Sequence, residues 1–144
     1  MKKYTIKKGG HYSGYRFRPI LFPRSVSFEF MFTEESKYIS EPHTRLREQW
    51  NKLGGFAFDL FGYRSNRIAW QYNSDTDQFE ICYYLHVKGK FKVVDGSIQI
   101  APINEWQSAY LYGGRGFLGY RQYPYFGGKA AAPNDVSIYL KFTK

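Results

Sequence analysis

A period-2 alternation, which puts the most apolar residues of three segments at every second position, is the feature that most constrains how this chain folds. The segments are residues 25–32 (SVSFEFMF), 78–87 (QFEICYYLHV) and 135–142 (DVSIYLKF). Successive side chains of a β-strand point to opposite faces, so each segment predicts a strand with one apolar face. The residues that make these faces are Val26, Phe28, Phe30, Phe32; Phe79, Ile81, Tyr83, Leu85, Val87; and Val136, Ile138, Leu140, Phe142.

Turn-forming residues separate these segments from weaker strand candidates. Short polar or glycine-containing stretches occur at residues 74–77, 88–90, 95–96, 113–114 and 127–128. Weaker strands are expected at 4–7, 56–61, 67–72, 91–94, 97–103, 109–112 and 117–120. Many short strands at this spacing favour an all-β protein, an antiparallel jelly-roll-like β-sandwich. We expect residues 25–144 to form it as a single domain.

One segment has a helical pattern. Ser40 is a good N-cap and Pro42 suits the first turn. Leu46, Trp50 and Leu53 follow at helical spacing, and the Gly54-Gly55 pair would end the element. The sequence therefore predicts one short helix that covers an end or an edge of the sandwich.

Positive charge is concentrated at the N-terminus. The chain has a net charge of +9, and most of it comes from residues 1–24, which contain no acidic residue. This composition predicts a basic N-terminal arm, with Lys7, Lys8, Arg16 and Arg18 as candidate contacts to a polyanion. Tyr and Phe alternate with arginine in residues 11–18 (HYSGYRFR), so nucleic acid is one alternative partner. A solvated arm without a partner is the simpler reading.

Several kinds of site are disfavoured by the sequence. The single cysteine, Cys82, excludes an internal disulfide, and three separated histidines lack metal-ligand spacing. The glycine-rich stretch 113–119 has no phosphate-loop motif, and no nucleophile elbow is present. We expect neither a metal nor a cofactor. Without an apolar signal region or membrane-length apolar run, we expect no signal peptide, no membrane contact, and a cytoplasmic or virion location.

A candidate ligand-binding surface lies on the polar faces of the predicted central strands. If these faces share one surface, Arg67, Gln71, Tyr84, His86 and Tyr139 lie together. Tyrosine, histidine and arginine are also the groups that a polysaccharide lyase uses. In that alternative Arg67 neutralises a uronate carboxylate while Tyr84 or His86 abstracts a proton. The simpler alternative is an ordinary solvated sheet face.

The stretch RQYPYFGGKAAAPNDVSIYLKF, residues 121–142, precedes and includes the last predicted strand. Its glycine pair and Pro133 fit a loop that turns the chain into that strand. Arg121, Tyr123 and Tyr125 could also form an exposed lip that binds a ligand.

Three segments together resemble a set of short β-jelly-roll proteins from gut bacteria and their phages. These segments are NKLGGF (51–56), NRIAWQYN…DQFEICYYLHVKGK (66–90) and YPYFGGKAAAPNDVSIYL (123–140). The resemblance implies the concanavalin-type sandwich of lectins and polysaccharide lyases, and covers roughly residues 50–142. The catalytic motifs of the lyases are not recognisable here.

Taken together, the sequence favours a non-enzymatic binding or structural module. A glycan-recognising domain and a phage virion-associated protein are the forms that we expect, with a glycan or a neighbouring protein of an assembly as partner. A lyase-like enzyme acting on an anionic glycan and a nucleic-acid-binding accessory protein are the alternatives. The high aromatic content, 21% of residues, also makes self-association an expectation.

Overall fold

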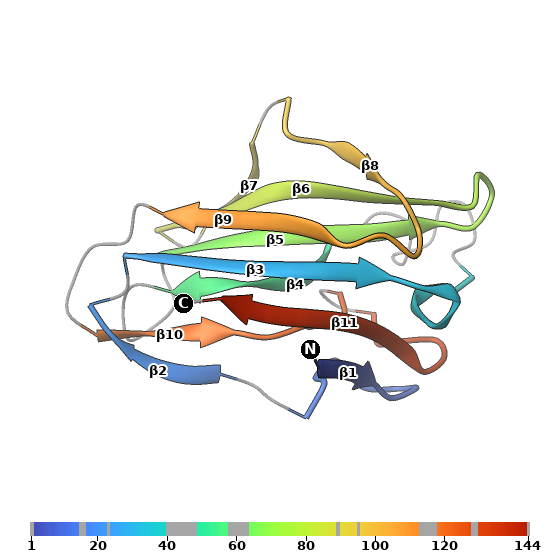
Figure 1. Ribbon diagram of the computed structural model, residues 1–144, viewed down its shortest axis with the longest axis horizontal. Helices are drawn as coiled ribbons and strands as arrows, with labels where there is room; N and C mark the ends of the chain where they lie inside the picture. Colours follow the sequence, from blue (N-terminus) through green and yellow to red (C-terminus); the bar gives the residue numbers. More distant parts are fainter. Residues whose placement is uncertain are drawn as a thin grey trace.

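The fold is a sandwich of two antiparallel β-sheets, as the alternating segments predict (Figure 1). The computed structural model describes residues 2–14, 17–22, 24–39, 49–57, 64–88, 90–94, 96–112, 118–127 and 130–143. Strands account for most of these residues, and the described part of the chain contains no α-helix. The predicted all-β class and sandwich architecture are therefore confirmed.

The smaller sheet contains four strands and is drawn in front of the larger sheet in Figure 1. Their order across the sheet is β1 (Lys2–Ile6), β11 (Val136–Thr143), β3 (Ser25–Phe32) and β9 (Gln107–Tyr112). β1 and β9 form its two edges. The central pair is the last strand of the chain and one of the three strongly alternating segments.

The larger sheet contains seven strands. The order is β2 (Phe17–Leu21), β10 (Leu118–Gln122), β4 (Asn51–Ala57), β5 (Arg64–Asn73), β6 (Gln78–Val87) and β7 (Lys90–Val93), with β8 (Gln99–Ala101) also paired to β6. β7 and β8 follow one another along the same edge of β6. Between them, Tyr83 donates its backbone N–H to the Ser97 hydroxyl, so a side chain replaces part of the ladder.

The two ends of the chain contribute strands to both sheets of the sandwich. β1 and β2 lie within the predicted basic arm of residues 1–24, and each pairs with a strand from the C-terminal third. β1 pairs with β11 in the smaller sheet, and β2 pairs with β10 in the larger sheet.

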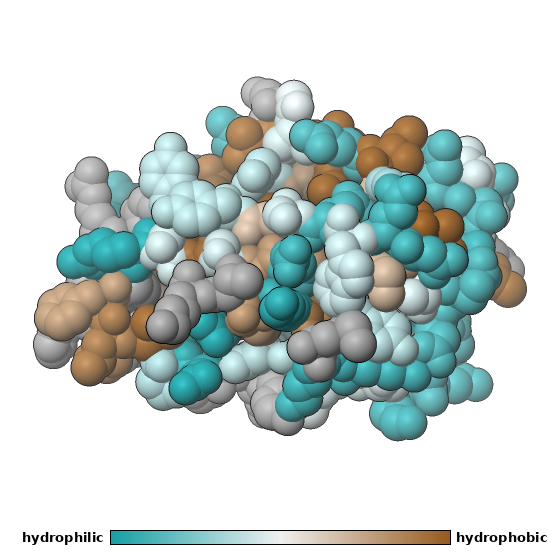
Figure 2. Space-filling view, viewed as in Figure 1, coloured by the Kyte–Doolittle hydropathy of each residue, from teal (hydrophilic) through white to brown (hydrophobic). Residues whose placement is uncertain are grey.

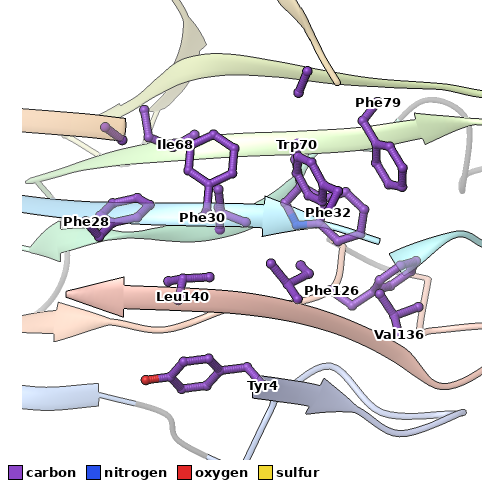
Figure 3. Close-up of a cluster of buried hydrophobic side chains, with 14 of the residues drawn as sticks. Tyr4, Phe28, Phe30, Phe32, Ile68, Trp70, Phe79, Phe126, Val136 and Leu140 are labelled. Carbon is purple, nitrogen blue, oxygen red and sulfur yellow. The ribbon is translucent and has the colours of Figure 1, made fainter. Parts of the chain in front are cut away.

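Aromatic residues dominate the core between the sheets (Figure 3). Phe32 of β3 stacks on Phe79 of β6, with ring centroids 4.4 Å apart, and lies 5.2 Å from the Trp70 ring of β5. Phe126, from the segment after β10, packs edge-on against Trp70 and Tyr38. Such pairs add about 0.5–1.5 kcal/mol each beyond the burial of their apolar area.

The larger sheet extends beyond the smaller one, which changes the burial along β6. Phe79 is buried, but Tyr83 and Val87 on the same face of the strand are 38% and 47% exposed. The alternation correctly predicts which face of β6 points toward the smaller sheet. How much of that face is buried depends on the width of the smaller sheet. Figure 2 shows mostly hydrophilic and pale side chains on the smaller-sheet side, with apolar ones mainly near the margins.

The prediction of a short helix is wrong for the part of that segment that the structure describes. Asn51–Ala57 form β4 in the middle of the larger sheet, and the first part of the predicted helix, residues 40–48, lies outside the described residues. β4 is buried throughout, so it lacks the alternation of a half-exposed strand. A register shift between Lys52 and Gly54 inserts Leu53 as a bulge and further disguises the pattern.

A short 3-10 helix, η1 (Glu34–Ser36), follows β3 and begins at a capping box formed by Thr33 and Ser36. The next residues place Tyr38 in the core, where its hydroxyl oxygen accepts hydrogen bonds from Tyr72 N and Asn51 Nδ2 at 3.1 Å and 3.0 Å. This buried hydroxyl ties the start of β4 to β5, so the position of β4 is fixed by tertiary contacts.

Candidate functional site

An open groove lies against the outer face of the larger sheet, on the side away from the core. Its volume is about 790 Å³. Strands β2, β4, β5, β6, β7 and β10 contribute to it, together with the segments before β2 and after β10. Its lining residues are Tyr12, Pro19, Lys52, Arg67, Tyr84, Phe91, Leu118, Gly119, Tyr120, Gln122, Tyr123, Tyr125 and Gly127.

One row of residues crosses the sheet beneath this groove. Gln122 of β10 lies opposite Gly55 of β4, Gly55 lies opposite Arg67 of β5, and Arg67 lies opposite Tyr84 of β6. A Cβ atom at position 55 would collide with the backbone of Asn66 and Arg67, so only glycine allows this close approach. Gln122 and Arg67 therefore lie on either side of a residue that has no side chain.

Aromatic rings form two walls of the groove. On one side, Tyr125 packs edge-on against Tyr12, with ring centroids 5.0 Å apart, and stacks on His11 at 5.4 Å. On the other side, Tyr84 stacks on Phe91 at 5.5 Å. Burial raises the pKa of both Tyr84 and Tyr125, so their phenols are neutral at physiological pH.

The wall around Tyr125 is held by backbone hydrogen bonds. Tyr125 exchanges two hydrogen bonds with Lys52, each 2.9 Å long, and Phe126 N donates to His11 O at 2.7 Å. The segment after β10 thus rejoins the larger sheet beside β4. Within the stretch 121–142, Phe126 faces the core and Tyr125 lines the groove, so the same few residues close the fold and shape the groove.

Lys52 is a nearly buried cation in the groove, only 9% exposed. Its Nζ donates to the Trp50 carbonyl oxygen at 2.8 Å and lies 4.7 Å from the centroid of the Tyr84 ring. Burial, with a further contribution from the charge of Arg67, lowers the pKa of Lys52 to about 8. The nearby thiol of Cys82 is no counter-ion, because burial raises its pKa to about 12.

Arg67 is the second cation of the groove. Its Nε donates to Ser65 Oγ at 3.2 Å, which orients the guanidinium, and burial lowers its pKa. The ion pairs among the described residues join Lys3, Lys7 and Lys37 to carboxylates and involve neither groove cation. No aspartate or glutamate is among the described residues that line the groove. The groove therefore holds two adjacent positive charges without an acidic partner from the described chain.

The structure brings some of the predicted site residues together. Arg67 and Tyr84 are cross-strand neighbours, and both line the groove, as do Tyr123 and Tyr125. His86 and Gln71 are on the same sheet face but do not line the groove. His86 stacks on Phe91, with ring centroids 4.1 Å apart, and Gln71 lies opposite Glu80.

Two predicted site residues lie elsewhere. Tyr139 belongs to β11, opposite Met31 in the smaller sheet, and is therefore separated from the groove by the core. Arg121 alternates with the groove residues Tyr120 and Gln122, so it points inward, with its guanidinium 4.5 Å from the centroid of the Phe142 ring. The expectations that Tyr139 joins the other residues and that Arg121 forms an exposed lip are corrected by these positions.

The candidate polyanion contacts are dispersed over the described residues. Lys7 pairs with Asp135 at 3.4 Å, and the backbone N–H of Lys8 donates to the same carboxylate at 2.9 Å. Arg18 lies on β2 opposite Arg121, and Arg16 falls outside the described residues. None of the three described residues lines the groove.

Sequence reasoning missed Lys52, Tyr12, Tyr120 and Gln122 as groove residues. Lys52 was hidden by the helical interpretation of its segment. The residues around it are brought together by strands far apart in the sequence. The available signal was a lone lysine directly before the apolar and glycine-containing run LGGFAF.

Neither a metal-binding cluster nor a membrane-spanning helix is found among the described residues. Among the described residues, no group of three or more histidines, cysteines or acids is placed to hold a metal ion. The same residues contain no helix of the length and apolarity needed to span a membrane. Comparison with protein-family models, curated proteins and solved structures yields no match for this chain, and the resemblance to gut-bacterial and phage jelly-roll proteins stays a prediction.

Proposed function

We propose that this protein is a glycan-binding module and that its ligand occupies the groove on the larger sheet. The observation that carries the proposal is the composition of the groove. Aromatic rings line opposite sides of an open channel, while Arg67, Lys52 and Gln122 supply polar groups between them. Sugar rings pack their apolar faces on aromatic side chains and satisfy their hydroxyls with such polar groups.

The open shape of the groove supports a chain-like ligand. Its volume of about 790 Å³ falls in the range of sites for drug-sized molecules, so it would accommodate a few sugar rings. The aromatic walls belong to separate segments that are packed and hydrogen-bonded in place, and they require little ordering when a ligand binds.

Binding without catalysis is favoured by the position of His86. A lyase that used Tyr84, His86 and Arg67 together would need them to converge on one sugar ring. No hydrogen bond joins these three described residues. The His86 ring stacks on Phe91, and His86 itself does not line the groove. The cross-strand pair of Arg67 and Tyr84 is sufficient for binding.

Nucleic acid is a weaker candidate for the same groove. Single-stranded nucleic acid is followed by a row of cations along its phosphates. Here two neighbouring cations lie in the groove, while Lys7 and Lys8 contact Asp135 at the end of β1 in the smaller sheet. The arrangement suits one charged group of a ligand better than a regular series of phosphates.

A glycan array followed by calorimetry tests the proposal. Tyr125→Ala removes a groove wall, and we expect it to weaken binding of the best glycan roughly tenfold. The matched control is Tyr112→Ala, which removes a 71% exposed tyrosine from β9 of the smaller sheet and should leave the affinity unchanged. Absence of binding across neutral and acidic glycans, or equal losses in both variants, would contradict the proposal.

A further inference from the structure

Lys52 has a hydrogen-bonding capacity that the described protein does not use. One N–H of its ammonium is committed to the Trp50 carbonyl, and the Tyr84 ring face lies beside it. An ammonium carries three donors, so further donors remain available on a side chain that lines the groove. A lysine that is nine-tenths buried normally has an acidic partner, because an unpaired charge loses its hydration.

Arg67 has unused donors on the same side of the sheet. Among the residues that the structure describes, only its Nε is engaged, by the Ser65 hydroxyl, and this bond leaves the terminal N–H groups of the planar guanidinium for a ligand. A guanidinium held in this way is suited to bind a carboxylate or a sulfate with two parallel hydrogen bonds. Arg67 and Lys52 also repel one another, and this repulsion adds to the cost of leaving both unpaired.

Gln122 adds a complementary acceptor beside these donors. Its Oε1 is buried and has no hydrogen-bond partner in the described part of the chain. Gln122 and Arg67 belong to the strands on either side of Gly55, at the same position along the sheet. A buried acceptor without a partner is destabilising, so a ligand hydroxyl that donates to it, once the amide turns toward the groove, would be stabilised at this position.

We infer that the groove contains a subsite for a single anionic group of an acidic glycan, bound between Lys52 and Arg67 while a hydroxyl of the ligand donates to Gln122 Oε1. This inference rests on the proposed function and specifies the class of sugar. The anionic group is a carboxylate, as in a uronic acid, or a sulfate ester. Both present several oxygens to the two cations and leave the ring free to pack on Tyr84.

The test compares two acidic ligands with one in which the carboxylates are neutralised. An oligouronate, the same oligosaccharide after methyl esterification of its carboxylates, and a sulfated oligosaccharide are titrated into the intact protein by calorimetry. We expect the oligouronate or the sulfated oligosaccharide to bind roughly ten- to hundredfold more tightly than the methyl ester. The better of these two ligands identifies the source of the anion.

Two variants separate the subsite from general charge attraction. Lys52→Met keeps the length of the side chain and should remove most of the preference for the acidic ligand. Lys141→Met removes the same charge from an exposed position on β11 in the other sheet and should retain the preference. Since Lys52→Met removes an unpaired buried charge, it is expected to fold, and a melting curve checks this.

The pH dependence of the wild-type protein provides a second measurement. The ionisable groups near Lys52 are Arg67 on β5, Cys82 and Tyr84 on β6, and Tyr125 after β10. Of these, the thiol and phenols are neutral near pH 8, because burial raises their pKa values. Affinity for the acidic ligand should therefore fall above about pH 8, by up to about tenfold for each pH unit, as Lys52 loses its proton.

The outcomes distinguish the inference from the proposed function. Tight binding of the methyl ester, or an acidic preference that survives Lys52→Met, overturns the anionic subsite while the glycan-binding function stands. Lack of affinity for every sugar overturns both. Preferential binding of single-stranded oligonucleotides, with a steep dependence on salt, overturns both in favour of the nucleic-acid alternative.

Discussion

Lys37 and Lys52 carry the same side chain in opposite surroundings. Lys37 follows η1 and pairs with Asp77 at 2.8 Å and Glu34 at 2.9 Å; these contacts raise its pKa. Lys52 lies in the groove beside Arg67, and burial lowers its pKa to about 8. The first lysine joins two parts of the fold, because Asp77 belongs to the turn between β5 and β6 and also accepts a hydrogen bond from Tyr72.

The difference indicates which charges serve the fold and which are available to a ligand. Around Lys37, the chain itself supplies a partner for each charged group: Lys37 pairs with Glu34 and Asp77, and Asp77 also accepts from the Tyr72 hydroxyl. Around Lys52, the described chain supplies aromatic rings, a carbonyl and a second cation. Unpaired cations in a concave site are costly in the free protein, and that cost is recovered when an anion binds.

Reversal of the Arg67 charge should have the largest effect, because it would remove the difference between the surroundings of Lys52 and Lys37. In Arg67→Glu the new carboxylate would pair with Lys52, as the carboxylates of Asp77 and Glu34 pair with Lys37. We expect binding of the acidic glycan to fall more than about a hundredfold, because the ligand would then face a like charge. Calorimetry measures the loss, and Lys141→Glu in the smaller sheet is the control for a change in net charge.

A second effect of Arg67→Glu concerns the proton of Lys52. A carboxylate in place of the guanidinium should raise the pKa of Lys52 well above its present value of about 8. NMR titration of a protein labelled at the lysine Nζ follows this change. If the Lys52 pKa stayed the same, the two side chains would not interact, and the proposed subsite would lose its geometric basis.

The free energy of unfolding should depend on pH through Lys52. Below about pH 8 Lys52 is protonated in both the folded and the unfolded chain, and the cost of burying the charge is fully present. Between about pH 8 and 10.5 the folded protein releases this proton while the unfolded chain retains it. The free energy of unfolding should therefore rise with pH over this interval.

Comparison with Lys52→Met isolates this contribution. The wild type should gain up to about 3 kcal/mol relative to the variant across the interval, since each pKa unit corresponds to about 1.4 kcal/mol. The cation–π contact with Tyr84 offsets part of the cost of burying the Lys52 charge. The gain in the free energy of unfolding should therefore be smaller than this limit. Urea unfolding at a series of pH values measures both proteins, and parallel curves would show that Lys52 is not destabilised by burial.

The sequence predicted the strands that have one covered face. β3 and β11 show this most clearly, because Phe30 and Leu140 lie on the predicted apolar faces and are buried as expected. β4 was missed because both of its faces are buried and a bulge at Leu53 interrupts its register. The information that makes it a strand lies in its partners β5 and β10, which no local pattern reveals.

The site was predictable only where a hairpin determines it. Arg67 and Tyr84 lie on strands joined by the turn at residues 74–77, so their pairing follows from local sequence. Tyr139 was misplaced because alternation identifies the polar face of a strand but does not tell which sheet contains it. Lys52 and Tyr125 meet across more than half of the chain, and their proximity depends on the complete fold.

Substitution of Lys37 should have the smallest effect, and that effect is on stability. Lys37→Met removes both pairs to carboxylates that are themselves 63% and 75% exposed, so solvent and salt already weaken these interactions. We expect a slight fall in melting temperature at low salt, and the difference from wild type should shrink as salt is added. Below about pH 8, Lys52→Met should change the melting temperature in the opposite direction, because it removes an unpaired buried charge.

The sign of these two changes is more informative than their size. A stabilising Lys52→Met beside a destabilising Lys37→Met would mean that the fold keeps Lys52 at a cost, as expected for a residue that serves a ligand. If both substitutions destabilised the protein and both effects faded with salt, Lys52 would have a carboxylate partner in the folded chain. The groove would then already contain its own anion, and an acidic sugar would have to displace it.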